Sequence, residues 1–383
     1  MPRATSTPQG GKRTLVKSVL SGGSDPAEGH QLDFIPPACN PSGIAFDSVG
    51  NLYIADAASG GIWKVAPDAT GCASDDSADP KCSAIASSTA NSPINAFASG
   101  VPGTNGLAFD KSGNVWTGDG TTGLGRVWKI TGSGANCTSP TPITNCEEVF
   151  RIQPMSNDLD PATTGGISNV GSDRRTLPPG TIGTLGTALR TATNTGNSQP
   201  LVANGLAFSA AGDVLFVADT ARGALWQVKF NPDGSLKSGR GCDETFHPNT
   251  LCLDNIFVAD PRLEGADGIA LDQNENIWVS VNERNAIAIF GKGVSAEVFR
   301  NPVNPNSGLR NSSARDNSKI LEFPTSPFLL GNLFCTANSD GNRRDNSPNT
   351  AGEVNSSGPV GSRGKISCMD QDLTSPGLQL PIQ

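Results

Sequence analysis

NGLAFSAAGDVLFVADTARGALWQVKF, residues 204–230, contains three short apolar runs. A Gly-Asp pair precedes the second run, and an Arg-Gly pair precedes the third. Alternating apolar runs of this length, separated by Gly, Asn or Asp, are typical of antiparallel strands joined by tight turns. The segment therefore predicts a three-stranded antiparallel meander.

Four further segments repeat this arrangement, so one structural unit recurs along the chain. Trp63, Trp128 and Trp226 occupy the same place in the third run of their copies. A further apolar run follows each of the four clearest copies, at residues 94–98, 149–152, 256–258 and 296–299, so we predict four strands per unit. The other copies are SGIAFDSVGNLYIADAASGGIWKV (42–65), NGLAFDKSGNVWTGDGTTGLGRVWKI (105–130), DGIALDQNENIWVSVNERNAIAIF (267–290) and the degraded FPTSPFLLGNLFCTANSDGN (323–342).

Four-stranded units repeated around an axis form a β-propeller, in which each sheet packs against its neighbours. A β-solenoid or an array of sandwiches is the alternative, but its repeats are usually shorter than the spacing of roughly 60 residues seen here. We predict an all-β protein with one propeller domain over residues 14–383, preceded by a disordered segment at residues 1–13. A Gly-, Thr-, Ser- and Pro-rich insertion around residues 154–200 is either a poorly recognisable blade or a loop over one face.

Composition narrows the class of partner. The 383-residue chain has 45 glycines, 28 prolines and 17% charged residues, which suits a turn-rich all-β protein. Its net charge of −8 argues against nucleic acid as the main partner. No apolar run approaches the length of a membrane span. We therefore expect a small-molecule substrate, and neither a nucleic acid nor a membrane.

The cysteines predict hairpin disulfides. Three pairs lie nine or ten residues apart, between the third and fourth runs of a repeat: Cys72 with Cys82, Cys137 with Cys146, and Cys242 with Cys252. This spacing across a hairpin can meet disulfide geometry, whereas no pair has the CxxC spacing or the matching histidine of a zinc site. Cys335 and Cys368 are predicted to join two strands of the last blade. Cys39 then has no partner among the predicted pairs, so it is either free or paired in an alternative way. Disulfides in this number indicate an oxidising compartment, so we expect a secreted or periplasmic protein in a mature or shortened form without its signal peptide.

The innermost strands of a propeller converge on a central channel, so the residues that open them should project toward one mouth. In four repeats this residue directly precedes a glycine, in an xG[IL]A frame, and the degraded repeat offers Thr325 or Ser326. Side-chain oxygens that meet at one point suit a hard cation such as calcium. The alternative is that Asn and Asp before Gly are ordinary turn residues. The four residues are Ser42, Asn105, Asn204 and Asp267.

The xG[IL]AFD…GN[LV]…AD pattern and its spacing resemble the senescence marker protein/gluconolactonase/luciferin-regenerating-enzyme family, a regucalcin-like family of six-bladed propellers. The resemblance covers repeats one to four and implies six blades and a divalent cation, usually calcium, at the central mouth. Asn204 and Asp267 match the family's asparagine and aspartate ligands, and Asp267 also matches the general base of the lactonases. Asn105 falls at or beside a polar position on the substrate side. Ser42 stands where the family has a glutamate, which removes one carboxylate from the ligand set.

Three functional hypotheses follow. The resemblance implies a cation-dependent hydrolase of a lactone or related ester, with Asp267 as general base. A second hypothesis is a non-hydrolytic enzyme of secondary metabolism, catalysing a condensation, isomerisation or cycloaddition, which orients its substrate by Arg and Asn hydrogen bonds without a metal. The third is a non-catalytic binding propeller. Asn105, Ser42, Arg174, Arg175 and Arg343 are the candidate substrate-binding residues, although an arginine on a loop is by default a solvated charge.

Two other chemistries are less favoured. The only histidines, His30 and His247, lie outside the repeats, which argues against a histidine-based triad or metal centre. His247 is expected to be an exposed residue of the loop between Cys242 and Cys252. Asp119 and Asp219 end second strands, where an aspartate usually accepts a hydrogen bond from the following turn, and Asp56 holds the same place in the first repeat.

Overall fold

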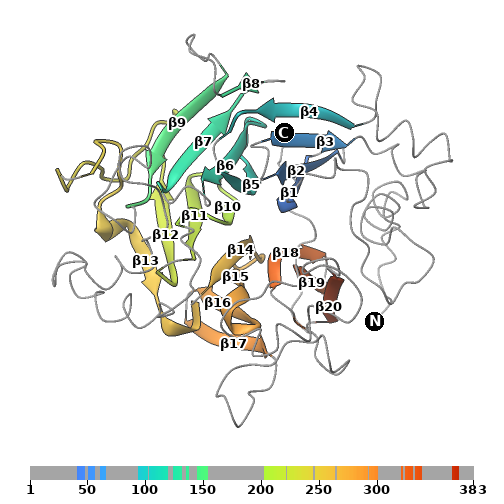
Figure 1. Cartoon of the computed structure of the whole chain (residues 1–383). Helices are drawn as coiled ribbons and strands as arrows, with labels where there is room; N and C mark the ends of the chain where they lie inside the picture. Colours follow the sequence, from blue (N-terminus) through green and yellow to red (C-terminus); the bar gives the residue numbers. More distant parts are fainter. Residues whose placement is uncertain are drawn as a thin grey trace, which may run out of the picture.

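The computed structural model describes the strand-rich parts of the chain (Figure 1). The predicted N-terminal segment 1–13 and the insertion around 154–200 lie outside the described residues, as do Cys39, Cys72 and Cys82. No helix among the described residues is long and apolar enough to cross a membrane. The described residues are 41–47, 51–56, 61–65, 94–101, 103–119, 124–131, 135–137, 145–153, 202–220, 222–244, 246–263, 265–291, 293–300, 321, 324–330, 333–338 and 365–370.

Five sheets contain all the described strands, one sheet for each repeat. The first comprises β1 (Pro41–Phe46), β2 (Leu52–Asp56), β3 (Gly61–Val65) and β4 (Ile94–Ser99), with the short β8 (Ala135–Asn136) added at its edge. The second comprises β5 (Thr104–Phe109), β6 (Val115–Asp119), β7 (Arg126–Ile130) and β9 (Cys146–Arg151). The third comprises β10 (Leu206–Phe208), β11 (Val214–Asp219), β12 (Ala224–Lys229) and β13 (Ile256–Ala259). The fourth comprises β14 (Ala266–Leu271), β15 (Ile277–Val281), β16 (Ala286–Gly291) and β17 (Val294–Arg300). The fifth comprises β18 (Pro324–Leu330), β19 (Leu333–Asn338) and β20 (Lys365–Asp370).

The sheets surround one axis, with β1, β5, β10, β14 and β18 innermost (Figure 1). Each of these strands contacts the next in this order, and β18 contacts β1. This arrangement is a β-propeller, as predicted, and the predicted fourth strand of each clear repeat is present as β4, β9, β13 and β17. The predicted count of six blades is wrong for the described part of the chain, which forms four blades of at least four strands and one three-stranded sheet. The sixth blade came from the family resemblance alone, whereas the five inner strands already close on one another.

Glycine is required where the inner strands approach the axis. A Cβ atom on Gly106 would lie 2.3 Å from the carbonyl oxygen of Asn204 and 2.7 Å from the Cα atom of Gly205. One on Gly205 would lie 2.4 Å from the carbonyl oxygen of Asp267. Backbone hydrogen bonds cross both contacts, from Gly106 N to Asn204 O (3.2 Å) and from Gly205 N to Asp267 O (3.1 Å). The xG[IL]A frame therefore reflects close packing of neighbouring backbones and not a turn. Gly43 and Gly268 face the next inner strand in the same way.

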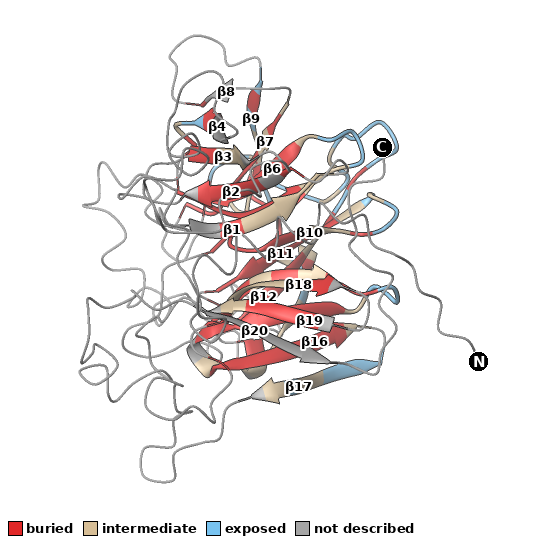
Figure 2. Ribbon diagram, turned by 90° about the vertical axis from the view of Figure 1, so that its right-hand side faces the viewer, coloured by how far each residue is buried: buried red, intermediate tan, exposed pale blue. Residues whose placement is uncertain are grey.

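The hydrophobic core lies between neighbouring sheets and has no single centre. One cluster joins Trp116 and Val127 of the second blade to Val217 and Trp226 of the third. Similar clusters lie between the other consecutive sheets, from the first to the fifth. The second strands β6 and β15 are buried along their whole length, because both of their faces pack against neighbouring blades. Figure 2 shows buried residues along the strands of successive blades. A single repeat cannot bury its faces alone, so each blade depends on the next for its stability.

One carboxylate organises the hairpin between the first and second strands. Asp110 accepts hydrogen bonds from both nitrogens of Asn114 and from Nε1 of Trp116. In the third repeat the aromatic residue is Phe216, which has no polar hydrogen, and the aspartate position is taken by Ser209. The AFD…GN part of the repeat therefore stabilises the hairpin between the first and second strands. Asp47 with Asn51 and Tyr53, and Asp272 with Asn276 and Trp278, repeat it.

The aspartates that end the second strands are structural as well. Asp219 accepts a hydrogen bond from the backbone nitrogen of Arg222, which confirms the expected turn contact. It also forms a fully buried ion pair with the Arg222 guanidinium and accepts a hydrogen bond from Trp226 Nε1. Asp119 forms the corresponding ion pair with Arg126.

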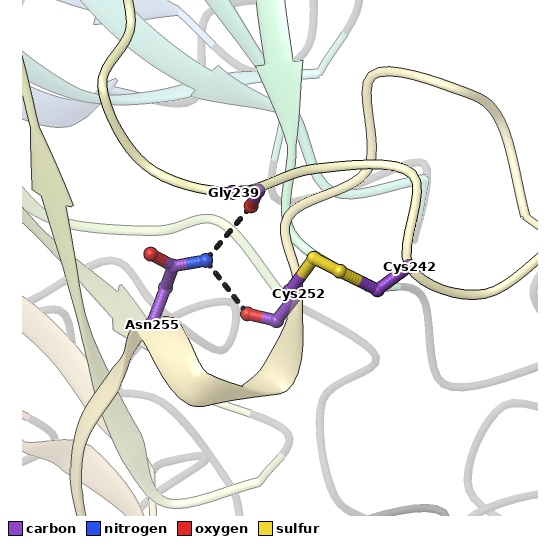
Figure 3. The surroundings of a disulfide bond; sticks show 4 residues. All are labelled: Gly239, Cys242, Cys252 and Asn255. Atoms are coloured by element: carbon purple, nitrogen blue, oxygen red, sulfur yellow. Dashed lines mark hydrogen bonds between the residues drawn. A yellow bond between two sulfur atoms is a disulfide. The ribbon is translucent and has the colours of Figure 1, made fainter.

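Two predicted disulfides are present in the described residues, Cys137–Cys146 and Cys242–Cys252, with Cα atoms 5.6 and 5.3 Å apart. Cys335 is also disulfide-bonded, and it lies opposite Cys368 in the register of β19 and β20. Figure 3 shows the Cys242–Cys252 bond. Beside it, the Asn255 amide nitrogen donates to the carbonyl oxygens of Gly239 (2.9 Å) and Cys252 (2.8 Å), which ties the loop to the start of β13.

Both disulfide loops reach back to the preceding blade. β8, which directly precedes Cys137, pairs in parallel with β4 of the first blade. In the second loop, Thr250 forms a parallel bridge with Arg151 at the end of β9. Two backbone hydrogen bonds accompany this bridge, from Arg151 N to Asn249 O and from Leu251 N to Arg151 O. The loops therefore cover outer edges of two sheets, where exposed strands would otherwise be free to pair with other chains.

Candidate functional site

The candidate site is formed by the residues that directly precede the glycines at the axis. The register of β5 with β6 shifts between Thr104 and Leu107, and that of β14 with β15 shifts between Ala266 and Ile269. Asn105 and Asp267 therefore lie at irregularities of the β-bulge type, which re-aim a side chain away from regular alternation. Asn204 lies two residues before the start of β10 and is held in place by a hydrogen bond from its backbone nitrogen to Ala218 O (2.9 Å).

Asn204 and Asp267 come from neighbouring inner strands, and both side chains are buried. The Asn204 side chain is hydrogen-bonded to the Asp267 carboxyl, where it lowers the pKa of that group. The amide of Asn282, which follows β15, donates to Oδ2 of Asp267 at 2.8 Å. Two asparagine side chains thus hold one carboxyl group at the axis.

The Asp267 carboxyl has an unusual electrostatic environment. Burial raises its pKa to about 7, and the hydrogen bonds from Asn282 and Asn204 offset only part of this effect. No ion pair joins it to a lysine or arginine among the described residues. A carboxyl group with this pKa is partly protonated and partly ionised at neutral pH, so it can both accept and release a proton there.

A hydrogen-bonded link crosses from the third blade to the fourth beside this carboxyl. The Asn204 amide nitrogen donates to Oγ1 of Thr220 at 3.0 Å. The Thr220 hydroxyl in turn donates to the carbonyl oxygen of Ala266, the residue that precedes Asp267. The side chains of Asn204 and Thr220 are both buried. Thr220 therefore connects Asn204 to the strand that carries Asp267.

The other predicted site residues fall into two groups. Asn105 is buried on β5, the inner strand next to Asn204, and Thr325 and Ser326 lie on β18. Ser42 lies on β1, but its side chain is outside the described part of the structure. Arg174, Arg175 and Arg343 are outside the described residues altogether.

Two titratable residues, Glu148 and His247, lie away from the axis. Glu148 is on the outermost strand β9, where burial, which would raise its pKa, is outweighed by hydrogen bonds from Arg151 and Asn249 that lower it. Glu148 therefore cannot replace the family's glutamate ligand, at whose position this chain has Ser42. His247 is exposed in the Cys242–Cys252 loop, as expected, and its Nδ1 contacts Oδ1 of Asn249 at 2.6 Å.

Comparison with known proteins supports the predicted family. Residues 163–306 match the family model described as SMP-30/Gluconolactonase/LRE-like region. The family resemblance is confirmed over this range. It includes Asn204 and Asp267, the two residues that carry the candidate site.

Several solved structures are similar to this chain. They include the calcium-binding protein regucalcin from Agrobacterium tumefaciens, with 14% identity over 90% of this chain and 79% of that chain and a TM-score of 0.44. The periplasmic gluconolactonase PpgL of Pseudomonas aeruginosa has 9% identity over 82% of this chain and 69% of that chain, with a TM-score of 0.41. The virginiamycin B lyase of Staphylococcus aureus has 10% identity over 87% and 68%, with a TM-score of 0.39. Identities and TM-scores this low carry no functional argument, and no curated protein sequence matches the chain.

The side chains at the axis have the donor chemistry that the SMP-30/gluconolactonase/LRE-like resemblance requires. Asp267 offers a carboxylate and Asn204 an amide oxygen, both hard oxygen donors of the kind that bind calcium. A buried carboxylate without a cationic side chain beside it fits one such cation. The described residues contain no cluster of three or more His, Cys, Asp and Glu side chains that could hold a metal ion.

Sequence reasoning missed Thr220 and Asn282. Each is the first residue after the second strand of its blade, next to Asp219 and Val281 respectively. The signal was a polar residue at this position in repeats three and four, whereas repeats one and two have Ala57 and Gly120 there. The two residues that hold the site thus occur in the same two repeats as Asn204 and Asp267.

Proposed function

We propose that this protein is an enzyme that hydrolyses a lactone or a related small ester at the central mouth of the propeller, with a divalent cation as cofactor. The observation that supports this most strongly is the contact between Asn204 and Asp267, which brings a carboxylate and an amide from two blades to one point at the axis. These are the residues that match the ligands of the SMP-30/gluconolactonase/LRE-like family, and they lie inside the matched range.

Asp267 is the general base in this proposal. A base works best when its pKa lies near the working pH, and in the metal-free protein burial brings the pKa of Asp267 to about 7. The carboxylate takes a proton from the attacking water, the oxygen of which bonds to the acyl carbon. The ring C–O bond of the lactone then breaks, and the leaving oxygen takes up a proton to give the hydroxy acid. Asn282 holds Oδ2 of Asp267 in place during this transfer.

The cation would be held by Asp267 and by the amide oxygen of Asn204, and we propose calcium because both donors are hard oxygens. When bound, it would supply Lewis-acid polarisation of the ester carbonyl. In this proposal Asn105, on the inner strand next to Asn204, binds a polar group of the substrate.

Lactone hydrolysis tests the proposal. Purified protein is assayed with γ- and δ-lactones at pH 6 to 7.5. The Asp267→Asn variant is compared with Asp233→Asn, because Asp233 is an exposed turn residue outside the inner strands. We expect Asp267→Asn to lower kcat by about 10²- to 10⁴-fold, the usual contribution of a general base. Asp233→Asn should leave kcat unchanged. Equal activity of the wild-type protein and Asp267→Asn would rule out the assigned role.

Cation dependence is tested separately with a chelator. Activity should fall on treatment with EDTA and return on addition of calcium. If activity instead persists without a cation but still requires Asp267, the hydrolase proposal stands without its cofactor.

The second candidate is a non-hydrolytic enzyme that binds and orients its substrate by hydrogen bonds. One observation favours it: the hydrogen-bond partners of Asp267 are the amides of Asn282 and Asn204, and the described residues contain no group of three or more His, Cys, Asp and Glu side chains that could hold a cation. Metal-independent turnover of a non-ester substrate, lost on replacement of Asn204 or Asp267, would favour this candidate over the hydrolase.

The disulfides support a third element of the proposal, that the protein works outside the cytosol, in an oxidising compartment. Cell fractionation followed by thiol labelling would test it. The native protein should be found outside the cytosol with Cys137, Cys146, Cys242 and Cys252 protected from labelling.

A further inference from the structure

We propose that Thr220 is a positioning residue that fixes the orientation of the Asn204 side-chain amide, with the nitrogen toward Thr220 and the oxygen turned away from Thr220. This inference rests on the proposed function, because the function assigns a role to the Asn204 oxygen. Thr220 itself touches neither substrate nor cation in this proposal, and it acts through Asn204.

The direction of the Thr220 hydrogen bonds follows from its partners. The carbonyl oxygen of Ala266 can only accept a hydrogen bond, so the single hydroxyl hydrogen of Thr220 points to it. Toward Asn204, the Thr220 oxygen can therefore only accept. The nearest Asn204 atom must be a donor, which is the amide nitrogen found 3.0 Å away.

A flipped Asn204 amide would face the Thr220 oxygen with its own oxygen, and a buried hydrogen bond would be replaced by a repulsive contact. The amide oxygen of Asn204 is therefore kept on the side away from Thr220, which leaves it available to the proposed cation.

The position of Thr220 in the repeat supports a specific role. It follows β11 directly, as Asn282 follows β15, and these two residues hold Asn204 and Asp267 respectively. The equivalent residues of repeats one and two, Ala57 and Gly120, have no side-chain hydrogen-bonding group. The hydrogen bonds of Asp110, which serve the hairpin alone, have counterparts in repeats one and four, so a purely structural feature recurs more widely than the hydroxyl of Thr220.

The test compares three variants of the full chain. Thr220→Val removes the hydroxyl with little change in shape, and Thr220→Ser retains it. Ser280→Ala is the matched control, because Ser280 is buried on β15 and loses one buried hydrogen bond, to Thr336, that does not reach Asp267. Unfolding curves establish that all three variants are folded before binding is measured.

Calcium binding is measured by titration calorimetry with calcium alone. We expect Thr220→Val to weaken calcium binding by about 10-fold or more, as is usual when the partner of a metal ligand is removed. Thr220→Ser and Ser280→Ala should bind within about threefold of the wild-type protein, and the lactonase kcat/KM should follow the same order. Unchanged calcium affinity in a folded Thr220→Val variant would overturn the proposal.

A second readout separates this inference from the proposed function. Hydrogen exchange of the Asn204 side-chain NH₂ group, followed by NMR without calcium or substrate, should be slow in the wild-type protein and Thr220→Ser and faster in Thr220→Val. If the wild-type protein binds no calcium and hydrolyses no lactone, the proposed function fails, and the exchange rates still decide the role of Thr220. Equal exchange in the wild-type protein and Thr220→Val would overturn it.

Discussion

Asp267 illustrates how one residue can serve chemistry at the expense of stability. Burial of its carboxyl favours the neutral form and brings the pKa to about 7 from an ordinary value of 3.8, although the hydrogen bonds from Asn282 and Asn204 offset part of this effect. A folded-state pKa above the unfolded value means that the native protein holds a proton that the unfolded chain releases. The stabilisation from this proton is fully present below pH 3.8 and is lost as pH rises through about 7.

Replacing Asp267 by asparagine should therefore change the pH dependence of stability. Asn has no charge to bury, so the metal-free Asp267→Asn variant should gain in melting temperature relative to the wild-type protein as pH rises from 4 to 8. Thermal unfolding in the presence of EDTA measures this difference. Adding calcium at pH 8 should raise the melting temperature of the wild-type protein and leave that of the variant unchanged. A difference that stays constant with pH would contradict the assigned environment of Asp267.

At the scale of the element, the inner strands are defined by how closely their backbones approach. Gly106, Gly205 and Gly268 each face the backbone of the next strand, and a side chain there would push two blades apart. The polar residue before each glycine is thereby brought to the axis. Close packing and site geometry are thus two results of the same xG pair.

The cost of adding one methyl group to Gly106 should show how closely the inner strands pack at the axis. In Gly106→Ala the new Cβ would lie 2.3 Å from Asn204 O, whereas in Gly239→Ala the nearest atom would be Cys252 Sγ at 3.5 Å. We expect Gly106→Ala to lower the free energy of unfolding by about 1–3 kcal/mol, the usual cost of overpacking, and Gly239→Ala to have little effect. Urea unfolding curves of the two variants provide the comparison. Equal stability would show that the inner strands can separate at no cost.

The Cys242–Cys252 loop is expected to stabilise the blade before it as well as its own. Replacing both cysteines by serine should lower the free energy of unfolding by about 2–4 kcal/mol. The backbone amides of Arg151 and Leu251 carry the hydrogen bonds between the loop and β9, so their hydrogen exchange should accelerate more than that of β15 amides. Exchange that rises equally across both blades would argue against a local role of the loop.

At the scale of the whole molecule, the strands within each repeat could be predicted from the sequence, whereas the contacts between blades could not. Alternating runs and their recurrence were enough to predict four strands per repeat, and the position of Asn204 and Asp267 before a glycine was enough to predict a shared mouth. The orientation of their side chains was not predictable, because Thr220 and Asn282 act from strand ends 16 and 15 residues away. The reach of the disulfide loops to the preceding blade was equally hidden, since it depends on how blades pack. The blade count was wrong because it came from a family and not from the five repeats of this chain.

The account depends most on the claim that the repeats bring Asn204 and Asp267 into contact in a buried site at the axis. NMR titration of the Asp267 carboxyl carbon in metal-free protein tests this claim directly, in the wild-type protein and in Asn204→Ala. We predict a pKa of about 7 in the wild-type protein and a higher value in Asn204→Ala, which lacks the hydrogen bond that lowers it. An ordinary carboxyl pKa of about 4, unchanged by Asn204→Ala, would contradict the account.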